Sequence, residues 1–446
     1  MHPVNLIRAA CAGALSLYFV TPAVAGDSIT ARKLELVRVN HEISEILERT
    51  RPKGPNAVPI PKFAIKSADN RFIMTIGGTI SPVLGFDIGN NLYNQDGAGI
   101  SFVTQSIPVP AQPGKKGDFF INPLGNTAID MQIVGFGGTA NEISGYIKIG
   151  SNGITNAIKL KKAYVSWRGL TAGMKSTLMK DGDACQPPTI DPQGPCGLVG
   201  NTAYEVSYTS RQYDGFRFAA ALDMPTFYSS NGYYWGKDYP VFDGTQVADY
   251  GDAEQIIPDI PLWAEYTFTS GTRVRLSGLM RSFSYRDKVT DKTRHKLGWG
   301  LMLSGNITPS KPIVLYYQAA YGKGIGNYIQ DLAGLPLSFL PEDSRPGRMT
   351  ATPMAGFTFG ASYSPVSWIQ FNAVSSHSRL WDAATYCRKL DTTQNYKCAT
   401  YLAVNCFWNI SPYLQWGVEY LWGNRRTWDH TGAHDSRIQT QLAFSF

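Results

Sequence analysis

The chain has 446 residues, of which 43% are hydrophobic, 12% aromatic and only 17% charged, with a formal net charge of +7. Charged residues make up about 25% of an ordinary soluble domain, so this composition disfavours a conventional soluble surface. No compact basic module with interleaved aromatic residues stands out, which argues against nucleic acid as a partner.

Residues 1–25 are predicted to be a secretory signal peptide. Its basic start ends at Arg8, an apolar run follows, and Ala23-Val24-Ala25 has the A-x-A form of a cleavage site. Because such a peptide is removed on export, the mature chain is expected to begin at Gly26 in an oxidising compartment.

Residues 26–50 are predicted to form a periplasmic helix. Ile29, Leu36 and Ile43 recur at one heptad position, and charged residues occupy the outer face. β-Branched residues at the seam favour a coiled coil of three or more chains. An amphipathic helix packed on its own domain is the alternative. The proline-rich residues 51–70 that follow are interpreted as a stiff linker.

Residues 71–446 change to an alternation of apolar and polar residues. No apolar run approaches the ~18 residues of a transmembrane helix. Sixteen alternating segments can be placed, at 71–86, 126–136, 142–150, 156–168, 170–179, 201–209, 216–224, 261–269, 272–286, 293–307, 313–322, 354–364, 369–380, 398–410, 413–423 and the final segment that ends at Phe446. A soluble β-sandwich also alternates, but it rarely has so many strands of ten or more residues.

The connections between these segments alternate between short and long. Ser270-Gly271 is a short one, whereas residues 323–353 form a long one. Tight turns at one end, long loops at the other and an even strand number are typical of outer-membrane proteins. The sequence therefore predicts an all-β fold, a sixteen-stranded antiparallel transmembrane β-barrel.

Residues 180–200 form a long polar loop between two of the predicted strands. Four of its residues are proline, which excludes a helix or a central strand. We expect this loop to fold into the barrel and constrict it, since long, stiff loops are commonly functional. An exposed surface loop is the alternative.

One of the six cysteines lies in the signal peptide, which leaves five in the mature chain. Cys185 with Cys196, and Cys387 with Cys398, each close a short polar loop, so two disulfide bonds are expected in an oxidising compartment. Unpaired thiols are the alternative. Cys406, within an apolar segment, is expected to remain a free thiol.

Several stretches, taken in order, resemble the DcaP-like trimeric porin family. They are L-K-K-A-Y-V-S-W from Leu160, Asp181 with P-T-I-D from Pro188 in the inserted loop, Y-G-K-G-I-G-N-Y-I from Tyr321, E-Y-L-W-G-N-R-R from Glu419, and R-I-Q from Arg437. The resemblance implies a homotrimeric diffusion channel surrounded by outer-membrane lipid of a Gram-negative bacterium. It also implies a preference for small anionic, carboxylate-bearing solutes, and recognition of Phe446 by the barrel assembly machinery.

Charged residues on the polar faces of the strands form the candidate site. The basic residues are Lys148, Lys159, Lys161, Lys175, Arg217, Arg273, Arg275 and Arg281, and the acidic residues of the constriction loop are Asp181, Asp183 and Asp191. Residues two apart on a strand share a face, so the basic residues predict a wall that faces the acidic loop and concentrates anions. The alternative is a set of ion pairs that only hold the loop in place.

No G-x-S-x-G or H-E-x-x-H motif occurs, and the six histidines are scattered. The cysteines also lack C-x-x-C spacing. We therefore expect neither enzymatic activity nor a cofactor or metal site. The alternative function is a barrel that binds external ligands without conducting, such as an adhesin or surface receptor.

Overall fold

The computed structural model describes residues 34–446, apart from 51–59, 62, 68, 70, 95–98, 152, 154–156, 183–185, 226–249, 255–256, 288, 336 and 389. The predicted signal peptide, the first part of the predicted helix, Asp183 and Cys185 lie outside the described residues. No helix among the described residues is long and apolar enough to cross a membrane.

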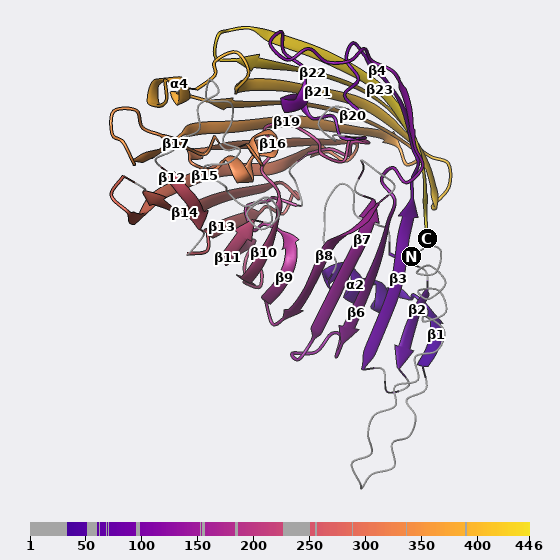
Figure 1. Cartoon of the computed structure of the whole chain (residues 1–446). Coiled ribbons are helices and arrows are strands. Elements are labelled where there is room, and N and C mark those ends of the chain that lie inside the picture. Colours follow the sequence, from indigo (N-terminus) through magenta and orange to yellow (C-terminus); the bar gives the residue numbers. More distant parts are fainter. Residues whose placement is uncertain are drawn as a thin grey trace, which may run out of the picture.

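The wall of the molecule is built from long strands. They are β3 (Phe72–Ile80), β4 (Val83–Ile88), β6 (Ala128–Gly135), β7 (Ile143–Ser151), β8 (Ile158–Trp167), β9 (Leu170–Ser176), β10 (Thr202–Thr209), β11 (Phe216–Pro225), β13 (Ile260–Thr267), β14 (Arg273–Asp287), β15 (Lys292–Ser310), β16 (Ile313–Lys323), β19 (Pro353–Val366), β20 (Ile369–Leu380), β21 (Tyr396–Asn409), β22 (Leu414–Thr427) and β23 (Gly432–Ser445). Successive strands pair antiparallel, and β23 pairs with both β3 and β4, which together make one wall strand. The sheet thus closes into a sixteen-stranded barrel (Figure 1), which confirms the predicted fold class.

Shorter elements accompany the wall. They are β1 (Leu34–Arg38), β2 (Phe63–Ser67), β5 (Phe119–Asn122), β12 (Tyr250–Glu254), β17 (Phe339–Pro341), β18 (Met349–Ala351), helices α2 (His41–Thr50) and α4 (Ala383–Tyr386), and the 3-10 turns η1 (Thr104–Ser106), η2 (Gly326–Tyr328) and η3 (Gln330–Leu332).

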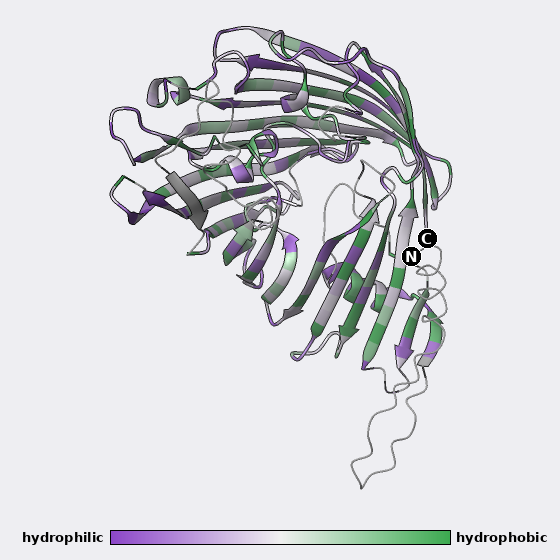
Figure 2. Ribbon diagram, in the orientation of Figure 1, coloured by the Kyte–Doolittle hydropathy of each residue, from purple (hydrophilic) through white to green (hydrophobic). Residues whose placement is uncertain are grey.

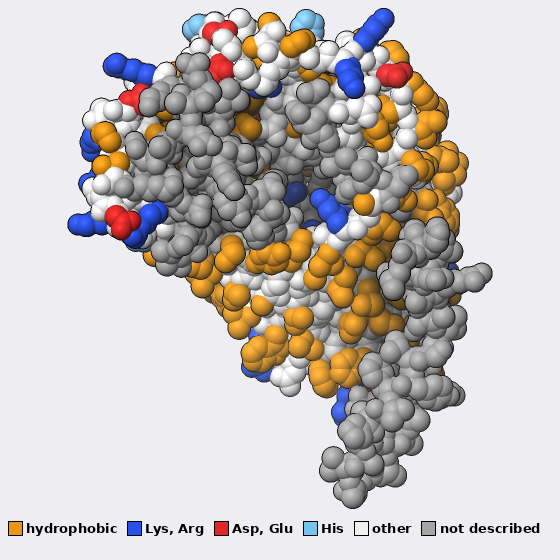
Figure 3. All heavy atoms as spheres, viewed as in Figure 1, with side chains coloured by type: hydrophobic (Ala, Val, Ile, Leu, Met, Phe, Trp, Pro, Cys, Tyr) orange, Lys and Arg blue, Asp and Glu red, His pale blue; other side chains and the backbone are white. Residues whose placement is uncertain are grey.

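Alternation along each strand separates an apolar outer face from a polar inner face. In β6, Ile129 and Ile133 are exposed, whereas Asp130, Gln132 and Val134 are buried. The ribbon accordingly changes repeatedly between hydrophobic and hydrophilic colours (Figure 2), and hydrophobic side chains cover much of the visible outer wall (Figure 3). Exposed apolar and buried polar residues reverse the order of a soluble protein and are typical of a membrane barrel.

Three long loops, residues 89–118, 177–201 and 324–352, fold into the barrel. Their apolar residues share one hydrophobic cluster with inward-facing wall residues. The cluster includes Leu92, Phe102, Ile107, Met179, Cys196, Val199, Tyr328, Leu332, Leu337 and Leu340 from the loops and Leu279, Met302, Met354, Val374, Tyr401 and Leu421 from the wall. This hydrophobic core occupies part of the lumen beside β14–β22.

Residues 34–50 do not form one continuous helix. Leu34–Arg38 is strand β1, which pairs with β2, and β2 in turn pairs with β3. Strand β2 also occupies part of the predicted linker. Helix α2 begins only after Asn40, whose Oδ1 accepts a hydrogen bond from the Ile43 N–H at 2.9 Å. This is an N-cap, so the helical pattern cannot continue back through Asn40.

Helix α2 packs inside the barrel instead of standing away from it. Ile43, Ile46 and Leu47 form a small cluster with Ala64, Ile73 and Val134. The Gln132 side chain, on the inner face of β6, donates to the Leu47 carbonyl at 3.1 Å. Arg49 pairs with Glu142 at 2.6 Å beside the short β6–β7 turn. For residues 41–50 the structure therefore shows the alternative, an amphipathic helix packed on its own domain.

We predict that Leu47→Ala releases α2 from the wall. Leu47 is fully buried, and a Leu→Ala change at such a site costs about 2–5 kcal/mol. A ten-residue helix is marginal on its own, so it should unfold once it is undocked. Faster tryptic cleavage after Arg49, followed by mass spectrometry, is the measurement. The exposed neighbour Glu48, changed to alanine, should leave the cleavage rate as it is in the unaltered chain.

Neither of the two predicted disulfide bonds is shown among the described residues. Cys398 is a thiol in β21 opposite Arg379 of β20, on the outward face of the wall. Cys387, by contrast, is buried in the hydrophobic cluster that the loops and the wall share. Cys196 is a buried thiol whose sulfur lies 3.7 Å from the Ala399 carbonyl. Its predicted partner lies outside the described residues. Cys406 is a free thiol, as expected.

Candidate functional site

The loop between β9 and β10, residues 177–201, is fixed to the wall near its first end by Asp181. The buried carboxylate accepts hydrogen bonds from Arg273 and from Ser304 Oγ, the latter at 2.7 Å. Arg275 lies 3.7 Å away from the same carboxylate. Burial raises the pKa of Asp181, but the charges of Arg275 and Arg273 outweigh burial and hold the pKa below its usual value. At this end the loop is ion-paired to β14.

The middle of the loop, at Ile190 and Asp191, is held on the opposite side of the lumen. The Glu419 carboxylate of β22 accepts hydrogen bonds from the Ile190 N–H at 3.0 Å and the Asp191 N–H at 2.9 Å. The Asp191 carboxylate accepts from the Phe102 N–H and the Tyr401 hydroxyl. Burial and the nearby Glu419 charge raise the pKa of Asp191 to about 7. Because β14 and β22 are far apart in the strand order, the loop crosses the lumen.

After this crossing, the loop backbone packs directly on the wall at Gly197. A Cβ on Gly197 would lie 2.3 Å from the His377 carbonyl, and one on Gly356 would lie 2.2 Å from the Gly197 carbonyl. The Ser376 hydroxyl accepts from the Gly197 N–H at 2.8 Å. Only glycine permits so close an approach, so the loop is pressed against β19 and β20 at this point.

A cavity of about 1790 Å³ remains between the inserted loop and the wall around β7–β9. A β-bulge in β8 determines which side chains face it. Lys148 pairs with Lys162, whereas the next pair is Ile149 with Leu160, so Lys161 is an extra residue. A bulge interrupts the alternation of faces, and neighbouring residues can then point to the same side.

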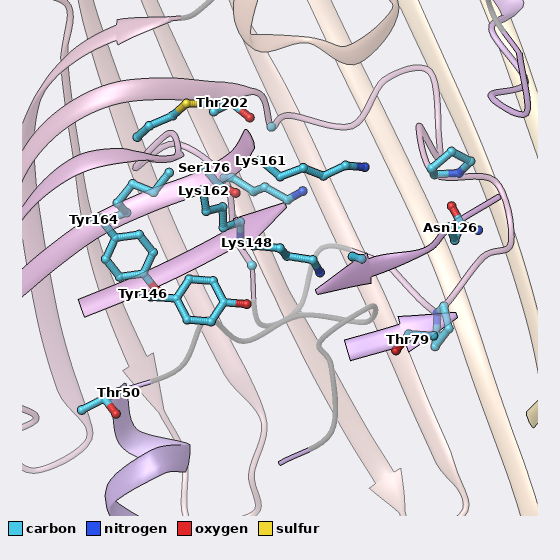
Figure 4. Close-up of a pocket in the computed structure, with 18 of the residues that line it drawn as sticks. Thr50, Thr79, Asn126, Tyr146, Lys148, Lys161, Lys162, Tyr164, Ser176 and Thr202 are labelled. Carbon is cyan, nitrogen blue, oxygen red and sulfur yellow. The ribbon is translucent and has the colours of Figure 1, made fainter. Parts of the chain in front are cut away.

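The bulge gathers lysines at the cavity. Lys148, Lys161 and Lys162 point into it beside Tyr146 and Tyr164 (Figure 4). Lys159 of β8 and Lys180 of the inserted loop line the same space. Among the ion pairs of the described residues, none involves Lys159, Lys161, Lys162 or Lys180. Lys159, Lys161, Lys162 and Lys180 therefore bring positive charge to the cavity without an ion pair to a described acidic residue.

The lysines predicted for the pore wall and the predicted arginines differ in their surroundings. Lys148, Lys159, Lys161 and Lys175 line the cavity, and Lys175 also pairs with Glu205 at 2.7 Å. The four predicted arginines, like Lys175, are each held by a carboxylate. The lysines are thus the predicted basic residues that a solute in the cavity would meet.

The arginines of β14 do not form the predicted open wall. Arg273, Arg275 and Arg281 are only 6%, 5% and 2% exposed, and only Arg275 reaches the cavity. Arg273 and Arg275 share the carboxylates of Asp181 and Glu265, with Arg275 2.6 Å from Glu265. Arg273 and Arg281 are buried away from the cavity, so the expectation that they meet solutes does not hold, whereas Arg275 reaches the cavity as the member of an ion pair.

The other two predicted arginines are also paired. Arg281 lies 3.0 Å from Asp259, and Arg217 lies 3.7 Å from Glu265 and over the Trp263 ring. The loop residues Asp181 and Asp191 are likewise buried anchors and do not face the basic wall across a passage.

Sequence reasoning missed Glu265, Lys162 and Lys180 as site residues. Glu265 lies directly opposite Arg275 in the β13–β14 register, on the same face of the sheet. The alternation of polar and apolar residues within 261–269 could have identified Glu265 as a residue of the inner face. Lys162 was not placed, because simple alternation sets it on the opposite face from Lys161. Among the described residues, no group of three or more His, Cys, Asp or Glu side chains is arranged to bind a metal ion.

A closed sixteen-stranded barrel with a loop folded across its lumen is the fold of an outer-membrane channel. No family model and no curated protein matches the chain. Among solved structures, the chain is similar in fold to the outer membrane channel DcaP of Acinetobacter baumannii. That match has a TM-score of 0.67 and 16% sequence identity, and it covers 85% of this chain and 99% of that one.

Two further structures are similar. The outer-membrane expressed OmpT of Vibrio cholerae has a TM-score of 0.50 and 9% identity, over 87% of this chain and 100% of that chain. An anion-selective porin from Comamonas acidovorans has a TM-score of 0.49 and 9% identity, over 84% and 100%. At such identities the likeness shows the fold, and the match to DcaP agrees with the family resemblance in the sequence.

Proposed function

We propose that this protein is an outer-membrane porin, a passive diffusion channel that favours small anionic solutes with carboxylate groups. The observation that carries the proposal is the lysine-lined cavity beside a loop that crosses the lumen. Several ammonium groups in a narrow, partly desolvated passage raise the local concentration of anions. Lysine donates hydrogen bonds from a flexible stem, so it binds a passing carboxylate weakly and releases it.

The inward-folded loops add to this proposal by restricting where solutes can pass. The hydrophobic cluster of the three loops occupies the lumen on the β14–β22 side. Solutes are thereby directed to the lysine side, where the wall is polar. The buried arginines contribute indirectly, because their ion pairs with Asp181 keep the loop in position.

The trimer and the assembly signal belong to the same proposal. The family resemblance supports a homotrimer. Phe446 closes the barrel through hydrogen bonds in both directions with Gly78, at 3.0 and 3.2 Å. A terminal phenylalanine at the closing strand is well placed for recognition by the barrel assembly machinery during insertion.

A planar-bilayer measurement tests the channel function. The purified protein should produce discrete conductance steps, and in a steep KCl gradient its reversal potential should have the sign of an anion-preferring channel. The hydrophobic cluster that fills part of the lumen is the observation that favours the alternative, a non-conducting adhesin or receptor. If folded protein produces no conductance steps, the result would support that alternative. A channel that prefers cations would contradict only the proposed preference for anionic solutes.

A further inference from the structure

A second group of basic residues lies outside the barrel, at the long-loop ends of β20–β22. Arg379 of β20 and Arg426 of β22 both lie opposite Cys398 of β21, so the three residues form a row on the outward face. Lys397 adjoins this row, at a register irregularity of β21. We call Arg379, Lys397 and Arg426 the outer basic patch.

The outer basic patch has no acidic partner among the described residues. None of its three residues takes part in an ion pair among the described residues. Nε of Arg379 is buried and has no hydrogen-bond acceptor there. The acidic residue of the adjacent turn, Asp429, is occupied by the hydroxyls of Thr427 and Thr431.

Basic residues at the same end of β14 and β15 are arranged differently. Arg286 pairs with Asp291 at 2.8 Å, and Arg294 pairs with Asp287. Arg286 and Arg294, at the long-loop end of β14 and β15, are therefore neutralised, unlike the residues of the outer basic patch.

The patch lies where the apolar band of the barrel ends. Farther along the same outward faces, Leu402 is 36% exposed and Tyr420 is 37% exposed. Aromatic rings mark the same level: Arg379 lies over the Trp381 ring, which contacts Tyr321. Aromatic side chains at the end of an apolar band lie at the headgroup level of a membrane.

We propose that the outer basic patch binds the phosphorylated headgroup of a lipid in the external leaflet, whose acyl chains lie along the adjacent apolar wall. Arg379 and Arg426 are separated by one strand, roughly 10 Å between backbones, so both long side chains can reach one phosphate. Arginine forks bind phosphate oxygens in a bidentate manner. Thr400 and Asn424, next along the same face, offer further polar groups. The inference rests on the outer-membrane location proposed above.

The test measures how much diphosphorylated lipid A the folded, detergent-purified protein retains after washing, by native mass spectrometry. The variant Arg379→Gln/Lys397→Gln/Arg426→Gln should retain less by on the order of tenfold or more, since each cation near a charged membrane surface adds to binding. The matched control Arg168→Gln/Arg211→Gln/Lys311→Gln removes three charges near the short-turn end and should retain the lipid normally. Arg426→Gln alone, at an exposed position, should give a smaller loss and covers the case in which the triple variant does not fold.

Two further arms identify the source of the phosphate. Lipid A stripped of its phosphates should be retained poorly, and inorganic phosphate should not displace the intact lipid. Equal retention by the triple variant and the unaltered chain overturns the proposal, as does equal retention of the dephosphorylated lipid or displacement by inorganic phosphate. Conductance in a bilayer of neutral lipid should be unchanged in the triple variant. A silent unaltered chain that still retains lipid A would refute only the channel function.

Discussion

Asp181→Ala is expected to free the first end of the inserted loop and to raise the single-channel conductance. Asp181 is fully buried between Arg273, Arg275 and Ser304. Removal of one partner from a buried ion pair costs about 3–5 kcal/mol, because the remaining charges stay buried without compensation. The loop should then leave β14, while Glu419 still holds its middle at Ile190 and Asp191, and the cavity should widen toward β14.

The measurement is single-channel conductance together with the frequency of its fluctuations. A loop that has lost its anchor at Asp181 should move more than the unaltered loop. We therefore expect larger and noisier currents than in the unaltered channel. Asp87→Ala is the matched control, since Asp87 is equally buried and pairs with Arg437 at 2.6 Å, but it contacts the loop of residues 89–118 instead. If both variants change the conductance alike, general destabilisation explains the effect and the anchoring role of Asp181 is wrong.

The barrel strands could be predicted from the sequence because their signal is local. Alternation over ten residues fixes both the strand and its outward face, and the order of short and long connections fixes the direction of each strand. The β14 and β15 segments placed at 272–286 and 293–307 are observed at Arg273–Asp287 and Lys292–Ser310. Residues that face lipid are apolar and the alternate residues, which face the lumen, are mostly polar. The pattern therefore remains clear along the whole wall.

Partners across strands could not be assigned from alternation alone. It places Arg275 on the inner face, but only the register shows that Glu265 lies opposite and neutralises it. The bulge at Lys161 is a second case, because one extra residue shifts the faces of β8 without any turn residue to announce it. The prediction of a continuous helix over residues 26–50 could also have been corrected from the sequence. Asn40, in the middle of the proposed heptads, is a good N-cap residue and indicates a helix start.

The lysines of the cavity should determine ion selectivity, and Lys159→Gln/Lys161→Gln/Lys162→Gln is the variant that tests it. Glutamine keeps a similar length and a hydrogen-bonding end, so the change removes charge with little change in shape. The three ammonium groups line the cavity and form no ion pair among the described residues. Their loss should therefore lower the attraction of the passage for anions instead of exposing acidic partners.

The expected result is a shift of the reversal potential toward cations and slower uptake of small carboxylates. In a wet lumen each charge contributes about 1 kcal/mol or less, so three of them should change the anion-to-cation permeability ratio by several-fold without closing the channel. Arg286→Gln/Lys292→Gln/Arg388→Gln removes the same charge from exposed residues that do not line the cavity, and it should leave the ratio nearly unchanged. Lys→Arg at the three cavity positions should preserve selectivity, because the charge remains. An unchanged ratio in the glutamine variant would show that solutes pass elsewhere, even though the barrel is a channel.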